Sequence, residues 1–278
     1  MGFRDKLQAA VAANRSYLCV GLDPDPALMP SVPLRAFLSA IIDATKDLVC
    51  AYKPNLAFFE ALGRDGFDAL TALRQAIPPE LPIIADGKRG DVGHSMAGYG
   101  RALFDLLAFD AATVSPYLGH DALAPFLERQ DKGIFILCRT SNPGGADLQE
   151  LPVQWEGSPR PLYEVVALLA RRWNERGNVG LVIGATYPNE LGRLRQLCPE
   201  MPILLPGVGA QGGDVSAAVA AGMDPEGGGL IINASRQVLY ASRGPDFAQA
   251  ARQAAQELQE AINRSREPRR AGQSHEPG

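Results

Sequence analysis

Short apolar segments alternate with amphipathic segments along most of the chain. The apolar segments contain few polar positions, which is typical of strands that are covered on both faces of a sheet. They span residues 17–22, 48–54, 82–87, 111–117, 133–139, 179–185, 202–208 and 230–235. The segments with helical periodicity span residues 34–48, 66–77, 95–108, 122–130, 161–177, 188–197, 213–222 and 246–264. A strict alternation of strand and helix predicts a parallel sheet.

Eight strand–helix units of about 30 residues each match a (β/α)8 TIM barrel, an α/β fold that fills one domain of this length. A doubly wound open sheet is the alternative. Such a sheet more often has about six strands and a Gly-rich first turn, whereas the first turn here, GLDPDPALMPS at 21–31, has no GxGxxG. We therefore predict a single barrel domain over residues 1–262 and a disordered polar tail over residues 263–278.

The segment at 141–161, SNPGGADLQELPVQWEGSPRP, is irregular and rich in turn-forming residues. Long irregular loops in compact domains usually serve function. We therefore expect this segment to cover the site and to close over a bound ligand.

The charge and the hydropathy of the chain exclude several classes of function. The formal net charge is −4, and nothing in that balance suggests nucleic-acid binding, which requires a basic face. No apolar run approaches the roughly 18 residues of a membrane span. The N-terminal segment at 1–16 is charged and lacks the apolar core of a secretory signal.

The cysteines and histidines argue against disulfide and metal chemistry. No CxxC or clustered Cys/His pattern occurs, and the three histidines are isolated, so we expect neither a metal site nor a cofactor. We expect buried, reduced thiols and a cytoplasmic protein. The cysteines are Cys19, Cys50, Cys138 and Cys198.

Polar side chains occur where the predicted strands end, and in a barrel these ends form the rim that carries the chemistry. Many of them have a plainer explanation. Asp23, for example, precedes a proline and is as well explained as a turn former. The polar residues at the strand ends include Asp23, Lys53, Asp86, Lys88, Asp91, Ser141, Asn142, Ser235 and Arg236.

The stretch ADGKRGDVGHS at 85–95 concentrates charge at the end of a strand. Lys53 ends the preceding strand, and because a buried lysine needs a partner, Asp86 is the obvious carboxylate for it. Asp86 and Lys88 are two positions apart, so they face the same side of an extended segment. A buried network that serves stability is the alternative, but buried ion pairs tend only to break even against apolar packing, so the array with Asp91 indicates chemistry.

The segment PGVGAQGGD at 206–214 has the composition of an anion-binding loop. Its glycines allow the backbone to approach an anion, Gln211 supplies a donor, and the helix that follows points its N-terminus at the site. Arg236, after the eighth strand, can hold a phosphate through two parallel hydrogen bonds. Loops after strands seven and eight of a barrel often bind phosphate, so we predict a phosphate-containing ligand.

Together these segments resemble the orotidine 5′-phosphate decarboxylase family. DGKRGDVGHS resembles the family's D-x-K-x-x-D signature in the form found in a bacterial branch of the family (type 2). The other similar segments follow in the family's order: GLDPDP, YKPNLAFFE, CRTSNPGG, VIGATYP, LPGVGAQGGD and NASRQVLYAS. The resemblance implies a TIM barrel that decarboxylates orotidine 5′-phosphate to uridine 5′-phosphate, the last step of de novo pyrimidine biosynthesis, without a cofactor.

The resemblance also implies roles for single residues. Lys53, Asp86, Lys88 and Asp91 would form the charged catalytic array, with Lys88 as the proton donor. Asp91 and Ser95 would reach into the partner's site across a homodimer interface. The substrate-binding roles are Asp23 for the ribose, Ser141 and Asn142 for the pyrimidine ring, and Gln211, Ser235 and Arg236 for the phosphate.

Two alternatives remain open at this point. The first is a related barrel decarboxylase that acts on a 3-keto sugar phosphate through a magnesium-stabilised enediolate and shares a DxKxxD. The second is a phosphosugar-binding barrel that senses its ligand without catalysis. The KRGD spacing and the TSNPG segment favour orotidine phosphate over the first, and the complete set of charged residues argues against the second.

Overall fold

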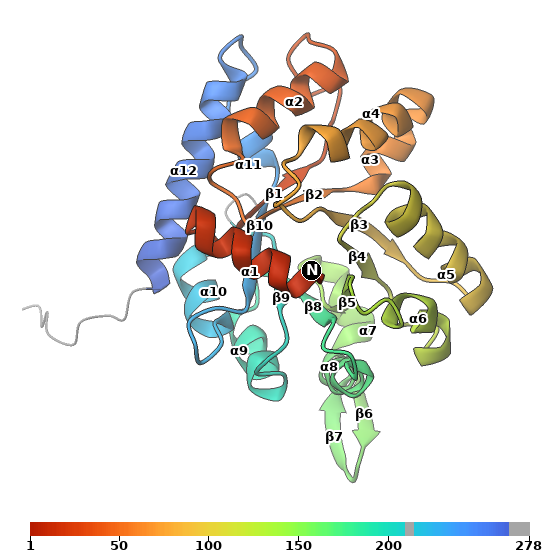
Figure 1. Cartoon of the computed structure of the whole chain (residues 1–278). Helices are drawn as coiled ribbons and strands as arrows, with labels where there is room; N and C mark the ends of the chain where they lie inside the picture. Colours follow the sequence, from red (N-terminus) through yellow and green to blue (C-terminus); the bar gives the residue numbers. More distant parts are fainter. Residues whose placement is uncertain (209–213, 267–278) are drawn as a thin grey trace, which may run out of the picture.

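A parallel barrel forms the centre of the molecule (Figure 1). The computed structural model describes residues 1–208 and 214–266. The strands are β1 (Leu18–Leu22), β2 (Ala51–Pro54), β3 (Ile84–Arg89), β4 (Ala111–Val114), β5 (Gly133–Arg139), β8 (Val179–Ile183), β9 (Ile203–Pro206) and β10 (Leu230–Ala234). Their order is β2-β1-β10-β9-β8-β5-β4-β3, and bridges between Tyr52 and Ile83 and between Asn55 and Asp86 bring the two ends together. The TIM-barrel prediction is confirmed, and the open sheet is wrong.

Helices surround this barrel (Figure 1). None of those in the described part of the chain combines the length and the apolar character needed to cross a membrane. They are α2 (Leu34–Thr45), α3 (Leu56–Ala61), α4 (Gly63–Ala76), α5 (Gly93–Gly100) with the π-helical turn η1 (Arg101–Leu106), α6 (His120–Leu127), α8 (Leu162–Trp173), α9 (Pro188–Leu197), α10 (Val215–Gly222), α11 (Arg236–Leu239) and α12 (Phe247–Arg266).

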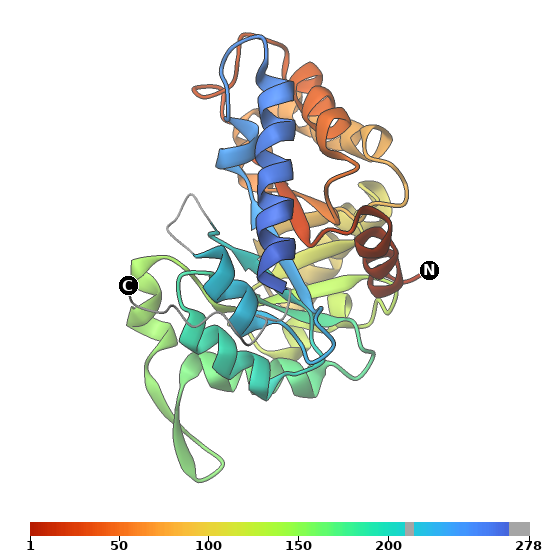
Figure 2. The same ribbon diagram turned by 90° about the vertical axis from the view of Figure 1, so that its left-hand side faces the viewer.

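The last helix extends further than the sequence predicts. α12 packs against α2 and α10 and runs along the side of the barrel (Figure 2). It ends at Arg266, so residues 263–266 are helical and the predicted boundary at residue 262 is four residues too early. The Arg266 guanidinium donates to the Gly227 carbonyl and lies 4.1 Å from the centre of the Tyr17 ring, which ties this last turn to the barrel. Residues 267–278 of the predicted tail lie outside the described residues.

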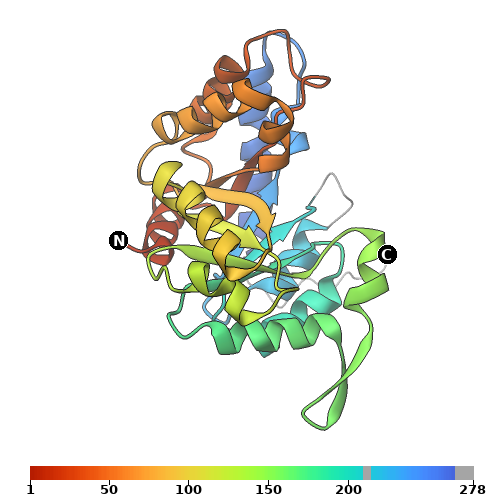
Figure 3. The same cartoon turned by 90° about the vertical axis from the view of Figure 1, so that its right-hand side faces the viewer.

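The segment at 141–161 is not the irregular loop that the sequence predicts. It contains the short helices η2 (Pro143–Gly145) and α7 (Ala146–Gln149). An antiparallel hairpin of β6 (Pro152–Trp155) and β7 (Ser158–Pro161) follows. The hairpin projects away from the barrel (Figures 1 and 3). Its strands are only half-buried, and closure of the segment over a bound ligand remains a prediction.

An N-terminal helix, α1 (Phe3–Asn14), closes one end of the barrel (Figure 1). Phe3 and Leu7 insert into a cluster of inward-facing strand residues, and Phe3 meets Phe135 edge to face with ring centres 5.6 Å apart. Gly133 lies directly beneath the Phe3 ring, because a β-carbon there would come within 2.4 Å of it. Apolar side chains therefore fill the interior of the barrel at this end.

The packing of Phe3 between α1 and the strands predicts how a substitution changes the stability of the fold. Phe3→Ala leaves an unfilled space between α1 and the barrel interior, so we expect the free energy of unfolding to fall by about 3–5 kcal/mol. Phe67→Ala, at an exposed position of α4, is the control and should change it by less than about 0.5 kcal/mol. Urea denaturation followed by circular dichroism measures both. If both substitutions lowered the free energy of unfolding equally, Phe3 would not stabilise the contact between α1 and the barrel.

Candidate active site

The period of two along each strand delivers polar groups to one rim of the barrel. Lys53, Asp86 and Thr113 each stand two positions beyond a residue of the inner core, and alternate strand residues face the same side. Those inner residues are Ala51, Ile84 and Ala111. The rim of the barrel therefore places an ammonium, a carboxylate and a hydroxyl on neighbouring strands, directly above an apolar interior.

A cavity of about 610 Å³ lies at this end of the barrel. Apolar side chains, among them Leu137, form part of its wall. The site residues that the sequence predicts and that line this cavity are Asp23, Lys53, Asp86, Lys88, Ser141, Asn142, Ser235 and Arg236. The structure thus brings together residues from five strand ends.

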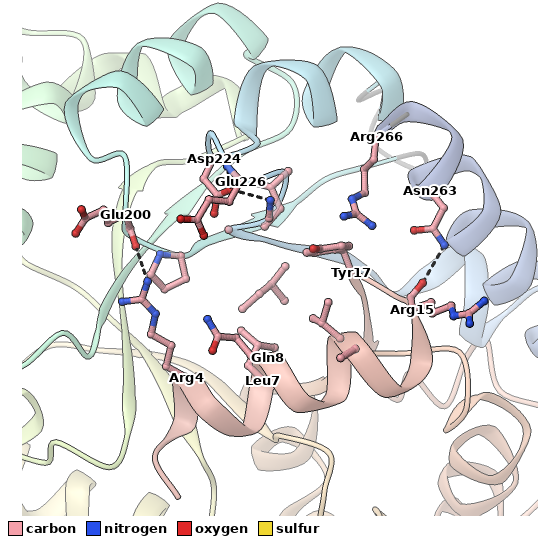
Figure 4. Close-up of a pocket in the computed structure, with 17 residues that line it drawn as sticks. Arg4, Leu7, Gln8, Arg15, Tyr17, Glu200, Asp224, Glu226, Asn263 and Arg266 are labelled. Atoms are coloured by element: carbon pink, nitrogen blue, oxygen red, sulfur yellow. Dashed lines mark hydrogen bonds between the residues drawn. The ribbon is translucent and has the colours of Figure 1, made fainter. Parts of the chain in front are cut away.

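A larger cavity, of about 840 Å³, lies at the opposite end between α1 and the barrel (Figure 4). Its polar groups contact the protein's own backbone: Arg4 donates to the Glu200 carbonyl, Asn263 to that of Arg15, and Asp224 accepts from the Gly228 amide. These contacts fasten helices and loops to the barrel. We place the active site in the smaller cavity, because the carboxyl ends of the strands and the charged array are there.

Asp86 is the centre of the charged array. Lys53 donates to Asp86 Oδ2 at 2.6 Å, and Lys88 donates to Asp86 Oδ1 at 2.6 Å. Thr113 donates to Oδ1 as well, at 3.0 Å. The predicted pairing of Lys53 with Asp86 is confirmed. Both carboxylate oxygens are thereby held, so the position of the negative charge is fixed before any ligand arrives.

The array also fixes its own protonation. Burial by itself favours the neutral forms of Lys53 and Asp86. The charges of Lys53 and Lys88 nevertheless hold the pKa of Asp86 well below its usual range, and the carboxylates of Asp86 and Asp23 raise the pKa of Lys53 above its usual range. At neutral pH the centre therefore contains a carboxylate and a buried ammonium, not a neutral acid and a neutral amine.

The sequence predicts that Asp86 and Lys88 face the same side of a regular extended strand. In the structure β3 is irregular at this point. Ala85 pairs with Ala112 and Arg89 with Val114, so three residues of β3 stand opposite Thr113 alone. Lys88 takes a left-handed conformation with φ of 46°, which is costly for a residue with a side chain. This bulge turns the Lys88 ammonium back onto Asp86 while leaving its side chain 48 % exposed to the cavity.

Two predicted residues lie away from the cavity of their own chain. Asp91 accepts a hydrogen bond from the Val92 amide at 2.7 Å, and Ser95 lies in the first turn of α5. Neither lines the cavity. Their predicted positions in a partner's site remain a prediction, since the structure contains a single chain.

The predicted anion loop is described only in part. Gly207 lines the cavity with a φ of 95°, whereas Gln211 lies outside the described residues. Asp214 caps the helix that follows, α10, and accepts from the amides of Ser216 and Ala217, so these two amides are already bonded, and the role of this N-terminus in binding an anion remains a prediction. Of the predicted phosphate contacts within the described residues, the backbone at Gly207 and the side chains of Ser235 and Arg236 remain.

Thr113 and Tyr240 are among the polar residues of the cavity wall that the sequence did not single out. The Tyr240 hydroxyl donates to the Asp23 carbonyl at 2.7 Å and accepts from the Asp25 amide at 2.6 Å. Burial raises the pKa of Tyr240 to about 12, so it keeps the proton that it donates. Asp23 Oδ1 is buried without a hydrogen-bond partner in the described structure, which leaves one acceptor ready for a ligand hydroxyl.

The depressed pKa of Asp86 predicts how stability changes in acid. A carboxyl with a lower pKa in the folded state stabilises the fold above its unfolded pKa, near 4, and this contribution is lost as the pH falls below that value. We expect the difference in free energy of unfolding between the natural protein and Asp86→Asn to fall by up to about 1.4 kcal/mol per pH unit below about pH 4. Urea denaturation between about pH 6 and about pH 3 measures it. A difference that stays constant over this range would contradict the pairing.

Comparison with known proteins agrees with this geometry. The model of the orotidine 5′-phosphate decarboxylase / HUMPS family matches residues 16–254. Orotidine 5′-phosphate decarboxylase of Thermomicrobium roseum is 51 % identical over 96 % of each chain, and that of Roseiflexus castenholzii is 55 % identical over 95 % of this chain and 98 % of the relative. The structure of Leishmania donovani OMP decarboxylase superposes with a TM-score of 0.85 at 42 % identity, covering 96 % of this chain and 99 % of that one. This chain therefore belongs to the orotidine 5′-phosphate decarboxylase / HUMPS family.

Proposed function

We propose that this protein converts orotidine 5′-phosphate to uridine 5′-phosphate and carbon dioxide, the last step of de novo pyrimidine biosynthesis. The observation that carries the proposal is the Asp86 carboxylate between two ammonium groups at the barrel rim, in a chain of this family. Relatives about 50 % identical over nearly the whole chain are orotidine 5′-phosphate decarboxylases, which favours this substrate over a 3-keto sugar phosphate.

The reaction needs a way to stabilise a localised charge. When the bond between C6 and the carboxylate breaks, the electron pair remains on C6 in the plane of the ring, where the π system cannot delocalise it. The Lys88 ammonium, already directed into the cavity, stabilises this pair electrostatically and then gives it a proton. The products are CO2 and a C6–H bond, and Lys88 regains its proton from solvent.

Asp86 acts on the substrate before the bond breaks. A substrate carboxylate about 4 Å from Asp86 is repelled by ~4 kcal/mol at an effective dielectric of about 20. The repulsion disappears as neutral CO2 forms, and its full value equals about a thousandfold in rate. Lys53 and Lys88 attract the same carboxylate and offset part of this. We therefore assign the larger part of the acceleration to Lys88.

The other lining residues serve to hold the substrate. The buried, unpartnered oxygen of Asp23 is suited to a ribose hydroxyl. Remote contacts of this kind can position the reacting end and exclude water. The proposed contacts to the pyrimidine are Ser141 and Asn142, and those to the 5′-phosphate are Gln211, Ser235 and Arg236.

We propose that no metal takes part. A divalent cation at the array would compete for Asp86 with two ammonium groups and a hydroxyl that already occupy both oxygens. A related decarboxylase that uses magnesium to hold an enediolate needs free carboxylate oxygens for it. The arrangement of Asp86 therefore supports a reaction without a metal or other cofactor.

We further propose a homodimer in which Asp91 and Ser95 complete the partner's site. Apolar side chains are exposed directly after Asp91 and in the segment before α6: Val92 is 58 % exposed, Tyr117 80 % and Leu118 42 %. Gly93 lies close to the Asp121 backbone at the start of α6, so this surface is continuous from β3 to α6. An exposed apolar patch beside a carboxylate that does not line the cavity of its own chain is typical of an association surface. We also propose a cytoplasmic location, supported by the buried cysteines, which are all free thiols.

Removal of the Lys88 ammonium tests the proposed chemistry. We expect the natural protein to consume orotidine 5′-phosphate, followed by the loss of pyrimidine absorbance, and to do so equally well with EDTA present. Lys88→Ala should lower kcat more than about a thousandfold, because the proton donor and the charge next to C6 disappear together. Lys46→Ala is the matched control, since Lys46 is 46 % exposed and pairs with Asp43, and it should keep full activity. No turnover by the natural protein would favour a sensor, and loss of turnover with EDTA would favour the magnesium-dependent enzyme.

Mixing two inactive variants tests the shared site. Asp91→Ala and Lys88→Ala should each have little activity alone. A heterodimer of the two contains one site with both natural residues, so subunit exchange should restore about a quarter of the natural activity. Restoration on mixing would place Asp91 in the partner's site, whereas no gain above the separate variants, with exchange verified by mass spectrometry, would contradict it.

A further inference from the structure

The Thr113 hydroxyl occupies an unusual position opposite the bulge of β3. It accepts a hydrogen bond from the Lys88 amide at 3.0 Å and donates one to Asp86 Oδ1 at 3.0 Å. Thr113 is 1 % exposed. A single hydroxyl thus contacts the backbone of one member of the charged pair and the side chain of the other.

One of these two hydrogen bonds supplies a partner for a backbone amide that the bulge of β3 leaves without one. Since three residues of β3 stand opposite one residue of β4, the Lys88 amide lacks the backbone partner that a regular parallel ladder would give it. A donor left without a partner costs about 1–3 kcal/mol where it is fully buried, and less at this part-buried amide. The Thr113 hydroxyl takes the place of that partner and holds Lys88 in its left-handed conformation.

The donor and acceptor roles in these two hydrogen bonds connect the backbone of Lys88 to the carboxylate of Asp86. The hydroxyl has one proton, which it gives to the carboxylate, and its lone pairs face the amide. The lysine ammonium then meets the same Oδ1 atom at 2.6 Å, so the ring of contacts runs from the Lys88 backbone through Thr113 and Asp86 to the Lys88 ammonium. A valine of the same shape can make neither bond.

We infer that Thr113 is a positioning residue for the decarboxylation, acting through its hydroxyl on Asp86 and Lys88. The inference rests on the proposed function. It predicts that the hydroxyl affects the bond-breaking step and not substrate affinity, because the proposed substrate contacts come from other strand ends. A displacement of about 1 Å in a reacting group can cost about a hundredfold in rate.

The test compares Thr113→Val with Thr113→Ser and with a matched control. We expect Thr113→Val to lower kcat by about 10–100-fold while KM changes by less than about twofold, and Thr113→Ser to restore most of kcat. The control is Thr45→Val. Thr45 is fully buried, its hydroxyl bonds to the Ile41 carbonyl and to the Tyr52 hydroxyl, and it does not line the cavity, so kcat should not change. If the valine variant does not fold, Thr113→Ala against Thr113→Ser isolates the same hydroxyl.

A second measurement does not depend on turnover. Hydrogen exchange of the Lys88 amide should be at least about tenfold faster in Thr113→Val than in the natural protein, because the amide loses the Thr113 hydroxyl that accepts its hydrogen bond. Unchanged kcat, a rise of KM alone, or equal losses in the Thr113 and Thr45 variants would overturn the inference. Natural protein without any turnover would instead overturn the proposed function, and the amide exchange would still report on the hydrogen bond.

Discussion

The ion pair between Lys53 and Asp86 is the interaction on which the site depends. Lys53 is nearly fully buried in the wall of the barrel, and a lysine in that position is stable as a cation only beside a carboxylate. Asp86 in turn remains a carboxylate because Lys53 and Lys88 lie on both sides of it. Each charge therefore stabilises the charged form of the others. The free-energy cost of bringing them together is met during folding, so the charges are already in place when substrate binds.

The barrel makes this arrangement possible by closing one end and opening the other. α1 fills the end of the barrel opposite the charges with Phe3 and Leu7, so the interior beside the charges is apolar. In such surroundings electrostatic interactions are stronger than in water. At the open end the bulge in β3 departs from regular pairing and directs Lys88 into the cavity. Local strain at one residue thus supplies the charge that the reaction needs next to C6.

Much of this could be predicted from the sequence, since it depends on periodicity. The eight apolar runs identified the barrel strands, and the rarity of unpaired buried lysines identified Asp86 as the partner of Lys53. Thr113 could not be found that way, because its importance comes from the register shift opposite it. Asp214 likewise looks like part of an anion loop, and only its bonds to the first amides of α10 show that it caps the helix. The hairpin at 152–161 was not predicted, because prolines, a glycine and charged residues interrupt any apolar run that would indicate its short strands.

The central claim is that the preset charges stabilise an electron pair on C6 of the pyrimidine. By microscopic reversibility, the same charges should promote removal of the C6 proton from the product. The direct measurement is deuterium incorporation at C6 of uridine 5′-phosphate in D2O, followed by proton NMR. The account predicts exchange with the natural protein and none above background with Lys88→Ala. Decarboxylation by the natural protein with no detectable exchange, or undiminished exchange with Lys88→Ala, would contradict it.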